Sequence, residues 1–287
     1  DQLAVTVATT TTLTTADASA MTDDVSLTLD NVTADTTVKT GSGDDTISMA
    51  AKLNNADTID GGANSLSTTV DTLSATVTGL TATTGALNVS NVERLNLTNA
   101  GTTVIDATNI TGANEIAIIT NTTKATVSNL AAAQTVALGT FNTDGAYGGI
   151  LVTSLADETG TEDSVTINLN DTATGNNNTV TLQATAIETV NLVVVDKTDT
   201  SNADHTLTVT ALNAGTITVA GSDADAGNTL SLGTLDTDTT NIDASGYFGI
   251  LTATAGTGTA LTSTVKGGTG AHVITGSTGS DTFTISG

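Results

Sequence analysis

Two adjacent nine-residue segments near the end of the sequence share one arrangement of glycine, polar and apolar residues. Segments 267–275 and 276–284 both have Gly at positions one and four, a polar residue at position six and an apolar residue at position eight. A third copy occupies 41–48, and a broken fourth copy runs through 54–64 and resumes, after an insertion, at 71–73. Carboxylates repeated at this spacing indicate cation binding, provided that successive turns stack.

The spacing allows each turn to present oxygen atoms to a cation. Glycine tolerates positive φ and lets successive turns stack closely. The sixth residue would project into the turn, while the apolar eighth residue would point from a short strand into the core. Stacked turns would form a row of pockets lined by carboxylate and carbonyl oxygens, which suits Ca²⁺, a hard cation that takes roughly 6–8 oxygen ligands.

Charge repulsion predicts that these turns depend on the cation. Two carboxylates about 4 Å apart repel each other by roughly 4 kcal/mol at an effective dielectric constant of about 20. Without a cation the stacked turns should loosen, so we expect calcium binding to be coupled to folding.

The nonapeptides resemble the repeats-in-toxin calcium-binding motif G-G-x-G-x-D-x-U-x, a parallel β-helix repeat. The Thr-, Ala-, Asn- and Gly-rich body around them, including 91–98 (NVERLNLT), resembles bacterial surface-layer proteins of the Caulobacter type that carry such repeats. The resemblance implies a calcium-dependent β-solenoid that tiles into a lattice over the cell. It also implies that the position-six calcium ligands are Asp45, Asp57 and Asp281. The turn glycines would be Gly41, Gly43, Gly276 and Gly279. Neighbouring residues that complete the calcium shells would be Asp44, Asp60, Asn64 and Asp71. The sequence departs from the motif at Thr40, His272 and Ser277.

Strands must position these turns, because alternation of apolar and polar residues recurs along the chain. Segments 25–29 (VSLTL) and 165–169 (VTINL) alternate in this way, and only 2% of the residues are aromatic. A thin core of Val, Ile, Leu and Ala suits a structure repeated along an axis better than one wide globule. We therefore predict an all-β, elongated parallel β-solenoid or β-roll, with a β-sandwich-like array as the alternative. Segment 129–136 is the best candidate for a helical turn.

Four segments are expected along the chain. They are a lead-in with edge strands at 1–38, calcium-binding turns at 39–75, an irregular solenoid body at 76–265 and the final nonapeptides at 266–287. Two pairs of similar segments, 92–97 with 187–192 and 147–151 with 247–251, suggest a degenerate duplication near 92–151 and 187–251. Chance similarity in so biased a composition is the competing explanation.

The composition excludes several classes of function. The chain has no Cys, so it has no disulfide or thiolate chemistry, and its two His have no neighbours that resemble a catalytic set. With 6 Lys+Arg against 30 Asp+Glu and a net charge of −24, we expect no nucleic-acid partner. No apolar run approaches the roughly 18 residues of a bilayer-spanning segment, so we expect no membrane insertion. Adaptation to high salt would also explain the overall acidity.

These observations predict an extracellular structural protein and not an enzyme. Calcium would order the turns, and identical subunits would then associate into a surface layer or filament, with cell-surface polysaccharide as a further possible partner. Unpaired backbone groups at the ends of a solenoid would offer docking edges. One alternative is a calcium-dependent adhesin segment that binds a surface, glycan or ice through regular Thr arrays. Another is the non-catalytic part of a secreted hydrolase, although the H-E-x-x-H and G-x-S-x-G motifs are missing from these residues.

Overall fold

The chain folds as the parallel β-solenoid that the sequence predicts, and it does not form the β-sandwich-like array that was the alternative prediction. The computed structural model describes residues 2–64, 70–99, 101–121, 123–139, 146–171, 179–184, 186–196, 204–210, 215–221, 228–258, 260–266 and 271–286. Within these residues every regular element is a β-strand except the 3-10 turn η1 (Ala107–Asn109). Residues 267–270, the first four of the nonapeptide 267–275, lie outside the described residues.

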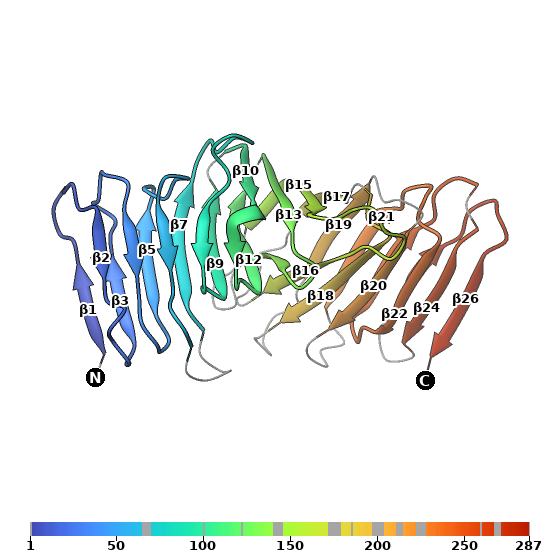
Figure 1. Ribbon diagram of the computed structural model, residues 1–287. Coiled ribbons are helices and arrows are strands. Elements are labelled where there is room, and N and C mark those ends of the chain that lie inside the picture. The colour runs from blue at the N-terminus through green and yellow to red at the C-terminus, as the bar shows by residue number, and fades with distance from the viewer. Residues whose placement is uncertain are drawn as a thin grey trace.

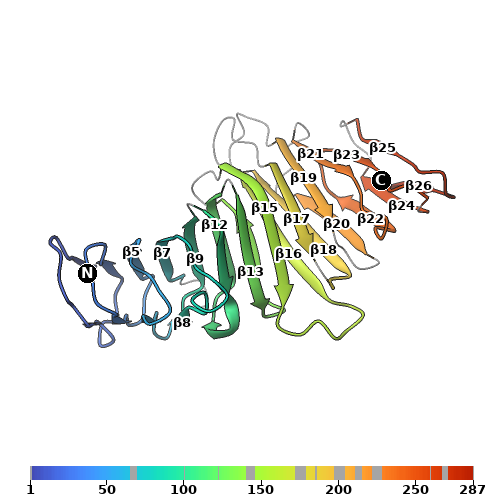
Figure 2. The ribbon, with the colours of Figure 1, turned by 90° about the horizontal axis from the view of Figure 1, so that it is seen from above.

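One parallel sheet, the long face, runs the whole length of the body (Figures 1 and 2). Neighbouring strands are separated in sequence by one coil, and the step between paired residues varies from 20 residues (Ser26↔Thr46) to 31 (Thr135↔Thr166). Its strands are β1 (Leu3–Thr6), β3 (Val25–Thr28), β5 (Thr46–Ala50), β7 (Thr72–Val77), β9 (Arg94–Asn99), β12 (Glu115–Asn121), β14 (Thr135–Leu138), β16 (Ser164–Asp171), β18 (Thr189–Asp196), β20 (Thr216–Gly221), β22 (Asn241–Gly246), β24 (Thr262–Lys266) and β26 (Thr282–Ser286).

Two shorter parallel sheets form the opposite side. The first holds β2 (Thr15–Asp17), β4 (Thr37–Lys39), β6 (Thr58–Asp60), β8 (Asn88–Ser90) and β11 (Ile110–Thr111). The second holds β10 (Thr103–Asp106), β13 (Lys124–Leu130), β15 (Ala146–Leu155), β17 (Thr179–Ala184), β19 (Asp204–Thr210), β21 (Thr229–Thr234), β23 (Ile250–Thr254) and β25 (Val273–Thr275). Successive coils therefore each supply a strand to the long face and a strand to a back sheet, and the coil that begins with β9 supplies one strand to each back sheet, β10 and β11.

Strand alternation places small aliphatic side chains between the two sides. In β7 and β9 every second residue is buried and the residues between them are partly exposed. The core consists mainly of Val, Leu, Ile and Ala stacked from coil to coil, together with Met49, and Tyr247 is its one fully buried aromatic among the described residues. The Tyr247 hydroxyl donates to the Asn228 carbonyl at 3.1 Å, so this polar group is satisfied inside the core.

The side chains that point outward from the long face also form columns. One column is unbroken in register from the first coil to the last, and we call it the outward column. It contains Ala4, Ser26, Thr46, Thr72, Arg94, Glu115, Thr135, Thr166, Asn191, Thr218, Asp243, Thr264 and Thr284. Its members follow one another at the spacing of parallel strands, about 4.8 Å.

The prediction of a helical turn at 129–136 is wrong. Strand β13 continues to Leu130, and a tight turn closed by the Gln134 amide donating to the Ala131 carbonyl at 2.9 Å leads directly into β14. Asn129 adopts a φ of 57°, which helices do not use. Pairing with the neighbouring coils therefore overrides the weak helical preference of the Ala residues.

The body is elongated, and the two termini lie at its opposite ends (Figure 1). The strands of the first half and those of the second half are inclined differently, with the change near β12 to β16 (Figures 1 and 2). The described residues include no helix with the length and hydrophobicity needed to cross a membrane.

Candidate metal site

Three acidic residues occupy the same place in three successive coils. Asp45, Asp71 and Glu93 each directly precede a residue of the outward column, at the start of β5, β7 and β9. We call these three residues the acidic column. The equivalent position holds Val25 in the preceding coil and Val165 further along, both buried. The acidic column therefore replaces apolar side chains on the inward side of the long face.

Each carboxylate of the acidic column accepts a hydrogen bond from the backbone of the preceding coil. The Val25 amide donates to Asp45 Oδ1 at 2.7 Å, and the Asp45 amide donates to Asp71 Oδ1 at 2.8 Å. The Asp71 amide in turn donates to Glu93 Oε2 at 2.8 Å. These charge-assisted bonds satisfy the amide at the start of each strand and link four coils in one chain.

Two carboxylate oxygens of this column are left over. Asp45 is 1% exposed and Asp71 is 0% exposed. Asp45 Oδ2 and Asp71 Oδ2 have no hydrogen-bond partner among the residues that the structure describes. A buried charged oxygen without a partner is costly, so a cation or a proton at these two atoms would stabilise the fold.

Burial and neighbouring charges make Asp71 hard to ionise. Burial raises the pKa of Asp71 to about 7, and the charges of Asp45, Glu93 and Asp44 contribute to the rise, while the hydrogen bond from the Asp45 amide opposes it. The three coils that carry the acidic column thus concentrate negative charge where little water is available to screen it.

Glycine makes room for oxygen atoms beside Asp71. A Cβ at Gly61 would overlap the Asn91 carbonyl oxygen and lie 2.8 Å from Asp71 Oδ2. The Asn91 carbonyl oxygen and Asp71 Oδ2 therefore both pack against Gly61 more closely than a side chain at position 61 would allow. Gly41 permits a similar approach, since a Cβ there would overlap the Met21 carbonyl oxygen.

The remaining residues of the early copies lie around this site or away from it. Asp44 is exposed; its amide donates to Asp24 Oδ1 at 2.9 Å, and its Oδ1 accepts from the Val70 amide at 2.9 Å. Gly43 adopts a φ of 145°, and a Cβ there would lie 2.9 Å from the Asp24 amide nitrogen. Asn64 follows β6 and is partly exposed.

Asp57 and Asp60 belong to the first back sheet and not to the acidic column. Asp57 precedes β6, where its two oxygens accept from the Thr36 amide at 2.7 Å and the Asn54 amide at 2.9 Å. Burial raises the pKa of Asp57, and these two hydrogen bonds oppose the rise. Asp60 ends β6 and accepts from the Asn91 side chain at 2.8 Å.

Asp281, in the last nonapeptide, precedes β26 as Asp45 precedes β5. Its Oδ1 accepts from the Leu261 amide and its Oδ2 from the Ser277 amide, both at 2.9 Å. Gly276 makes room for this carboxylate, because a Cβ there would overlap Asp281 Oδ2, and the Gly279 amide donates to Ser277 Oγ at 2.8 Å. Backbone amides therefore occupy both Asp281 oxygens.

The geometry divides the predicted position-six acids into two kinds. Asp57 and Asp281 use both oxygens on backbone amides, whereas Asp45 and Asp71 keep one buried oxygen each. Among the residues that the structure describes, no group of three or more His, Cys, Asp or Glu side chains lies close enough to hold a metal ion. A cation at the acidic column would therefore need backbone carbonyls, such as that of Asn91, besides the two aspartates.

The sequence reasoning missed Glu93 as a member of the site. The signal was available, since Asp45, Asp71 and Glu93 each directly precede a strand of alternating residues, and these strands recur at the coil period. Glu188, in the segment that resembles 92–97, has the same role, because its Oε2 accepts from the Asp163 amide at 3.1 Å. Strand pairing aligns Arg94 with Asn191 through the intervening coils, whereas the sequence similarity aligns Arg94 with Thr189, so the two segments are offset by two residues in the sheet.

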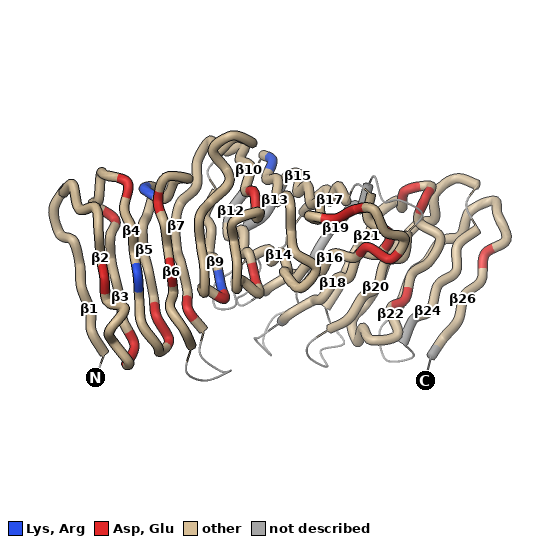
Figure 3. Tube along the Cα trace, viewed as in Figure 1, with Lys and Arg blue, Asp and Glu red and all other residues tan. Residues whose placement is uncertain are grey.

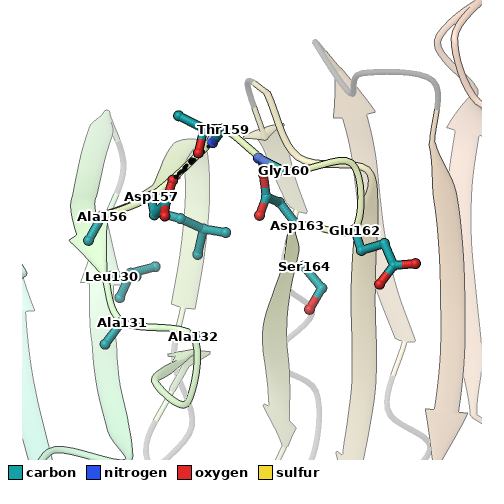
Figure 4. Close-up of a pocket in the computed structure, with 11 residues that line it drawn as sticks. Leu130, Ala131, Ala132, Ala156, Asp157, Thr159, Gly160, Glu162, Asp163 and Ser164 are labelled. Atoms are coloured by element: carbon teal, nitrogen blue, oxygen red, sulfur yellow. Dashed lines mark hydrogen bonds between the residues drawn. The ribbon is translucent and has the colours of Figure 1, made fainter.

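A separate pocket of about 390 Å³ lies between the turn at 131–132 and the loop at 156–163 (Figure 4). Leu130 and Leu155 line it together with acidic residues of the loop. Asp157 accepts from the Thr159 amide at 3.1 Å and from its hydroxyl at 2.7 Å, which lowers the pKa of Asp157. This carboxylate thus holds the loop in shape.

The fold and the acidic column define the class of this protein as an all-β parallel solenoid with carboxylates buried between its coils. Comparison with protein-family models, curated proteins and solved structures found no significant match to the chain. Its class therefore rests on the structure.

Proposed function

We propose that the chain is a calcium-stabilised structural subunit of an extracellular surface layer or filament. The observation that carries the calcium part is the pair of buried oxygens of Asp45 and Asp71, on adjacent coils, that have no hydrogen-bond partner among the described residues. Oxygen-only surroundings with flexible geometry suit Ca²⁺ better than metals that prefer nitrogen or sulfur. The family resemblance of the nonapeptides supports the same ion.

Asp45 and Asp71 would hold the ion, and the Asn91 carbonyl beside Gly61 would contribute a further oxygen. When bound, calcium supplies positive charge that offsets the repulsion between the stacked carboxylates. Glu93 holds Asp71 in place through the Asp71 amide. Because the site is formed by separate coils, binding would stabilise the stack relative to the unfolded chain.

The solenoid shape supports the structural part of the proposal. An elongated stack of coils presents long, regular faces and two ends, which repeat proteins commonly use for association. Acidic residues occur along the whole body while Lys and Arg are few, so copies must overcome mutual repulsion before they pack (Figure 3). Calcium between copies would reduce this repulsion.

Electron microscopy of the purified protein, with calcium and with excess chelator, tests this function. We expect ordered sheets or fibres with calcium and their loss on chelation. Calorimetric titration with calcium, on the wild type and on an Asp45→Asn/Asp71→Asn variant, tests the site separately. If the chelated protein keeps both its fold and its polymer, calcium is not the cause of assembly.

The outward column favours a second candidate, a calcium-dependent adhesin segment. Ser and Thr hydroxyls occupy most of its positions from Ser26 to Thr284, at the regular strand spacing. A flat, repeated array of hydroxyls fits a glycan or another surface with its own periodicity. Binding of monomeric protein to insoluble polysaccharides, without ordered assemblies in the microscope, would favour this adhesin function over the structural one.

A further inference from the structure

The outward side of β16, β18 and β20, three neighbouring strands of the long face, carries a grid of uncharged side chains (Figure 1). All of them are partly exposed and alternate along each strand with buried core residues. Neighbours lie about 4.8 Å apart across the strands and about 6.6 Å apart along them. We call this grid the neutral patch, and its three columns are Ser164, Thr189 and Thr216; Thr166, Asn191 and Thr218; and Asn168, Val193 and Ala220.

Hydrogen bonds between coils hold the two amide side chains of the neutral patch. Thr218 Oγ1 donates to Asn191 Oδ1 at 2.6 Å, so Asn191 keeps Nδ2 as a donor for an outside acceptor. Asn168 Nδ2 donates to Glu115 Oε2 at 3.1 Å, so Asn168 keeps Oδ1 as an acceptor. A donor and an acceptor are therefore fixed in advance on the same face, beside hydroxyls that can do either. Sugar hydroxyls, which both donate and accept, match such a set of groups.

The third column of the neutral patch adds apolar surface. Val193 and Ala220 are in register with each other and partly exposed, although they point to the same side as the polar residues. A sugar ring has the same two-sided character, with hydroxyl groups at its edge and C–H groups on its faces. A polysaccharide lying along the solenoid axis would place hydroxyls over the two polar columns and C–H groups against Val193 and Ala220, which would bury apolar surface.

Charge at the borders of the neutral patch selects against an anionic ligand. Asp243 follows Thr218 in the outward column, and hydrogen bonds from the Ser245 side chain and backbone lower the pKa of Asp243, which keeps it ionised. Glu115 lies in the same column on the other side of the patch. The patch itself has no cationic side chain, and the whole chain has a net charge of −24. A negatively charged chain would therefore be repelled, whereas an uncharged one would not.

From this arrangement we propose that the neutral patch binds an uncharged polysaccharide whose chain runs along the solenoid axis across β16, β18 and β20. The proposal rests on the second candidate function, the adhesin, and names its binding site and its ligand class. Ice fits this surface less well, because an ice face repeats the same group at every step. The patch changes residue type from coil to coil and ends at the ionised Asp243.

Affinity electrophoresis in calcium tests the ligand class. Native gels would contain dextran or hydroxyethylcellulose, and parallel gels would contain carboxymethyldextran or carboxymethylcellulose, which carry negative charge on the same backbones. We expect at least one neutral polymer to retard the wild type and its anionic counterpart to have no effect. Retardation by neither neutral polymer, or equal retardation by a neutral polymer and its anionic counterpart, would overturn the proposal. Adsorption of the wild type to ice, without retardation by a neutral polymer, would assign the face to ice instead.

A pair of matched variants tests the site. Asn191→Ala/Thr218→Ala removes the fixed donor and the hydroxyl that orients it, and it should weaken binding to the neutral polymer about tenfold or more. The control Ser74→Ala/Thr98→Ala changes two partly exposed outward residues of β7 and β9, and it should bind within about twofold of the wild type. Circular dichroism would verify that both variants keep the fold.

The outcomes separate failure of the site from failure of the function. If the wild type binds a neutral polymer and both variants bind it equally, the neutral patch is not the site, although the adhesin function stands. If the wild type binds no polymer, the adhesin function and the site both fall. Calcium-induced stabilisation against urea, measured on the same samples, reports on the acidic column independently of either result.

Discussion

Replacing Asp71 with Asn tests whether the acidic column is held together by a cation. The substitution keeps Oδ1 as the acceptor for the Asp45 amide and replaces the buried, unpartnered Oδ2 by an uncharged amide group. Because the folded-state pKa of Asp71 is raised from 3.8 to about 7, its contribution to stability is greatest at low pH and is lost as the pH rises from about 4 to 7. Above that range the ionised carboxylate costs up to about 4 kcal/mol, since each pKa unit corresponds to about 1.4 kcal/mol.

Without calcium at pH 8, the Asp71→Asn variant should therefore be more stable than the wild type by about 2–4 kcal/mol. At pH 5 the wild-type carboxyl is mostly protonated in the folded state, and the difference should fall to roughly 1–2 kcal/mol. Saturating calcium should reverse the order or remove the difference. The wild type gains about 2.7 kcal/mol at a calcium concentration a hundred times the Kd, while the variant gains much less.

Urea unfolding followed by circular dichroism, at both pH values and with calcium or chelator, measures these differences. Asp57→Asn is the matched control, because both Asp57 oxygens accept backbone amides and its amide group would face a donor. That control should lose about 1–3 kcal/mol with or without calcium. The reasoning would be refuted if Asp71→Asn were destabilised in chelator, or if calcium stabilised it as much as the wild type.

Four further substitutions, one of them a control, test the stack itself by urea unfolding. Gly41→Ala should lower the free energy of unfolding by about 3 kcal/mol or more, because the new methyl group would overlap the Met21 carbonyl. Gly79→Ala, at a φ of 67° with open space around it, is the control and should lower it by only about 1 kcal/mol. Equal losses would contradict the close approach of coils at Gly41. Leu95→Ala should lose about 2–5 kcal/mol, because the side chain is fully buried between neighbouring coils, and a smaller loss would mean that the coils collapse into the cavity. Tyr247→Phe should lose about 1 kcal/mol, because it removes one buried hydrogen bond to the Asn228 carbonyl, which keeps the Ile250 amide as its other donor. An unchanged midpoint would show that the hydroxyl bond is not formed in solution.

The sequence alone predicts the fold class because the relevant information is local. Alternation in segments such as 25–29 and 165–169 defines strands, and the scarcity of aromatic residues restricts the core to a thin layer of small side chains. Glycines such as Gly41, which allow coils to approach closely, could also be placed from the nonapeptide spacing. Local patterns fail at 129–136, where pairing with neighbouring coils decides between strand and helix.

Which residues make up the candidate site depends on which residues meet across neighbouring coils. The sequence alone does not predict these contacts, because the coil length varies from 20 to 31 residues. Asp45 and Asp57 look alike as sixth residues of a repeat, yet one enters the long face and the other a back sheet. Tertiary register places Glu93 beside Asp71 and leaves Asp45 and Asp71 with unpartnered buried oxygens, while backbone amides satisfy Asp57 and Asp281. Residue type and spacing determined that carboxylates would lie between stacked coils. Only the register determined which of them are buried without a partner among the described residues, because these hydrogen bonds and the desolvation act between coils, across twenty or more positions in the sequence.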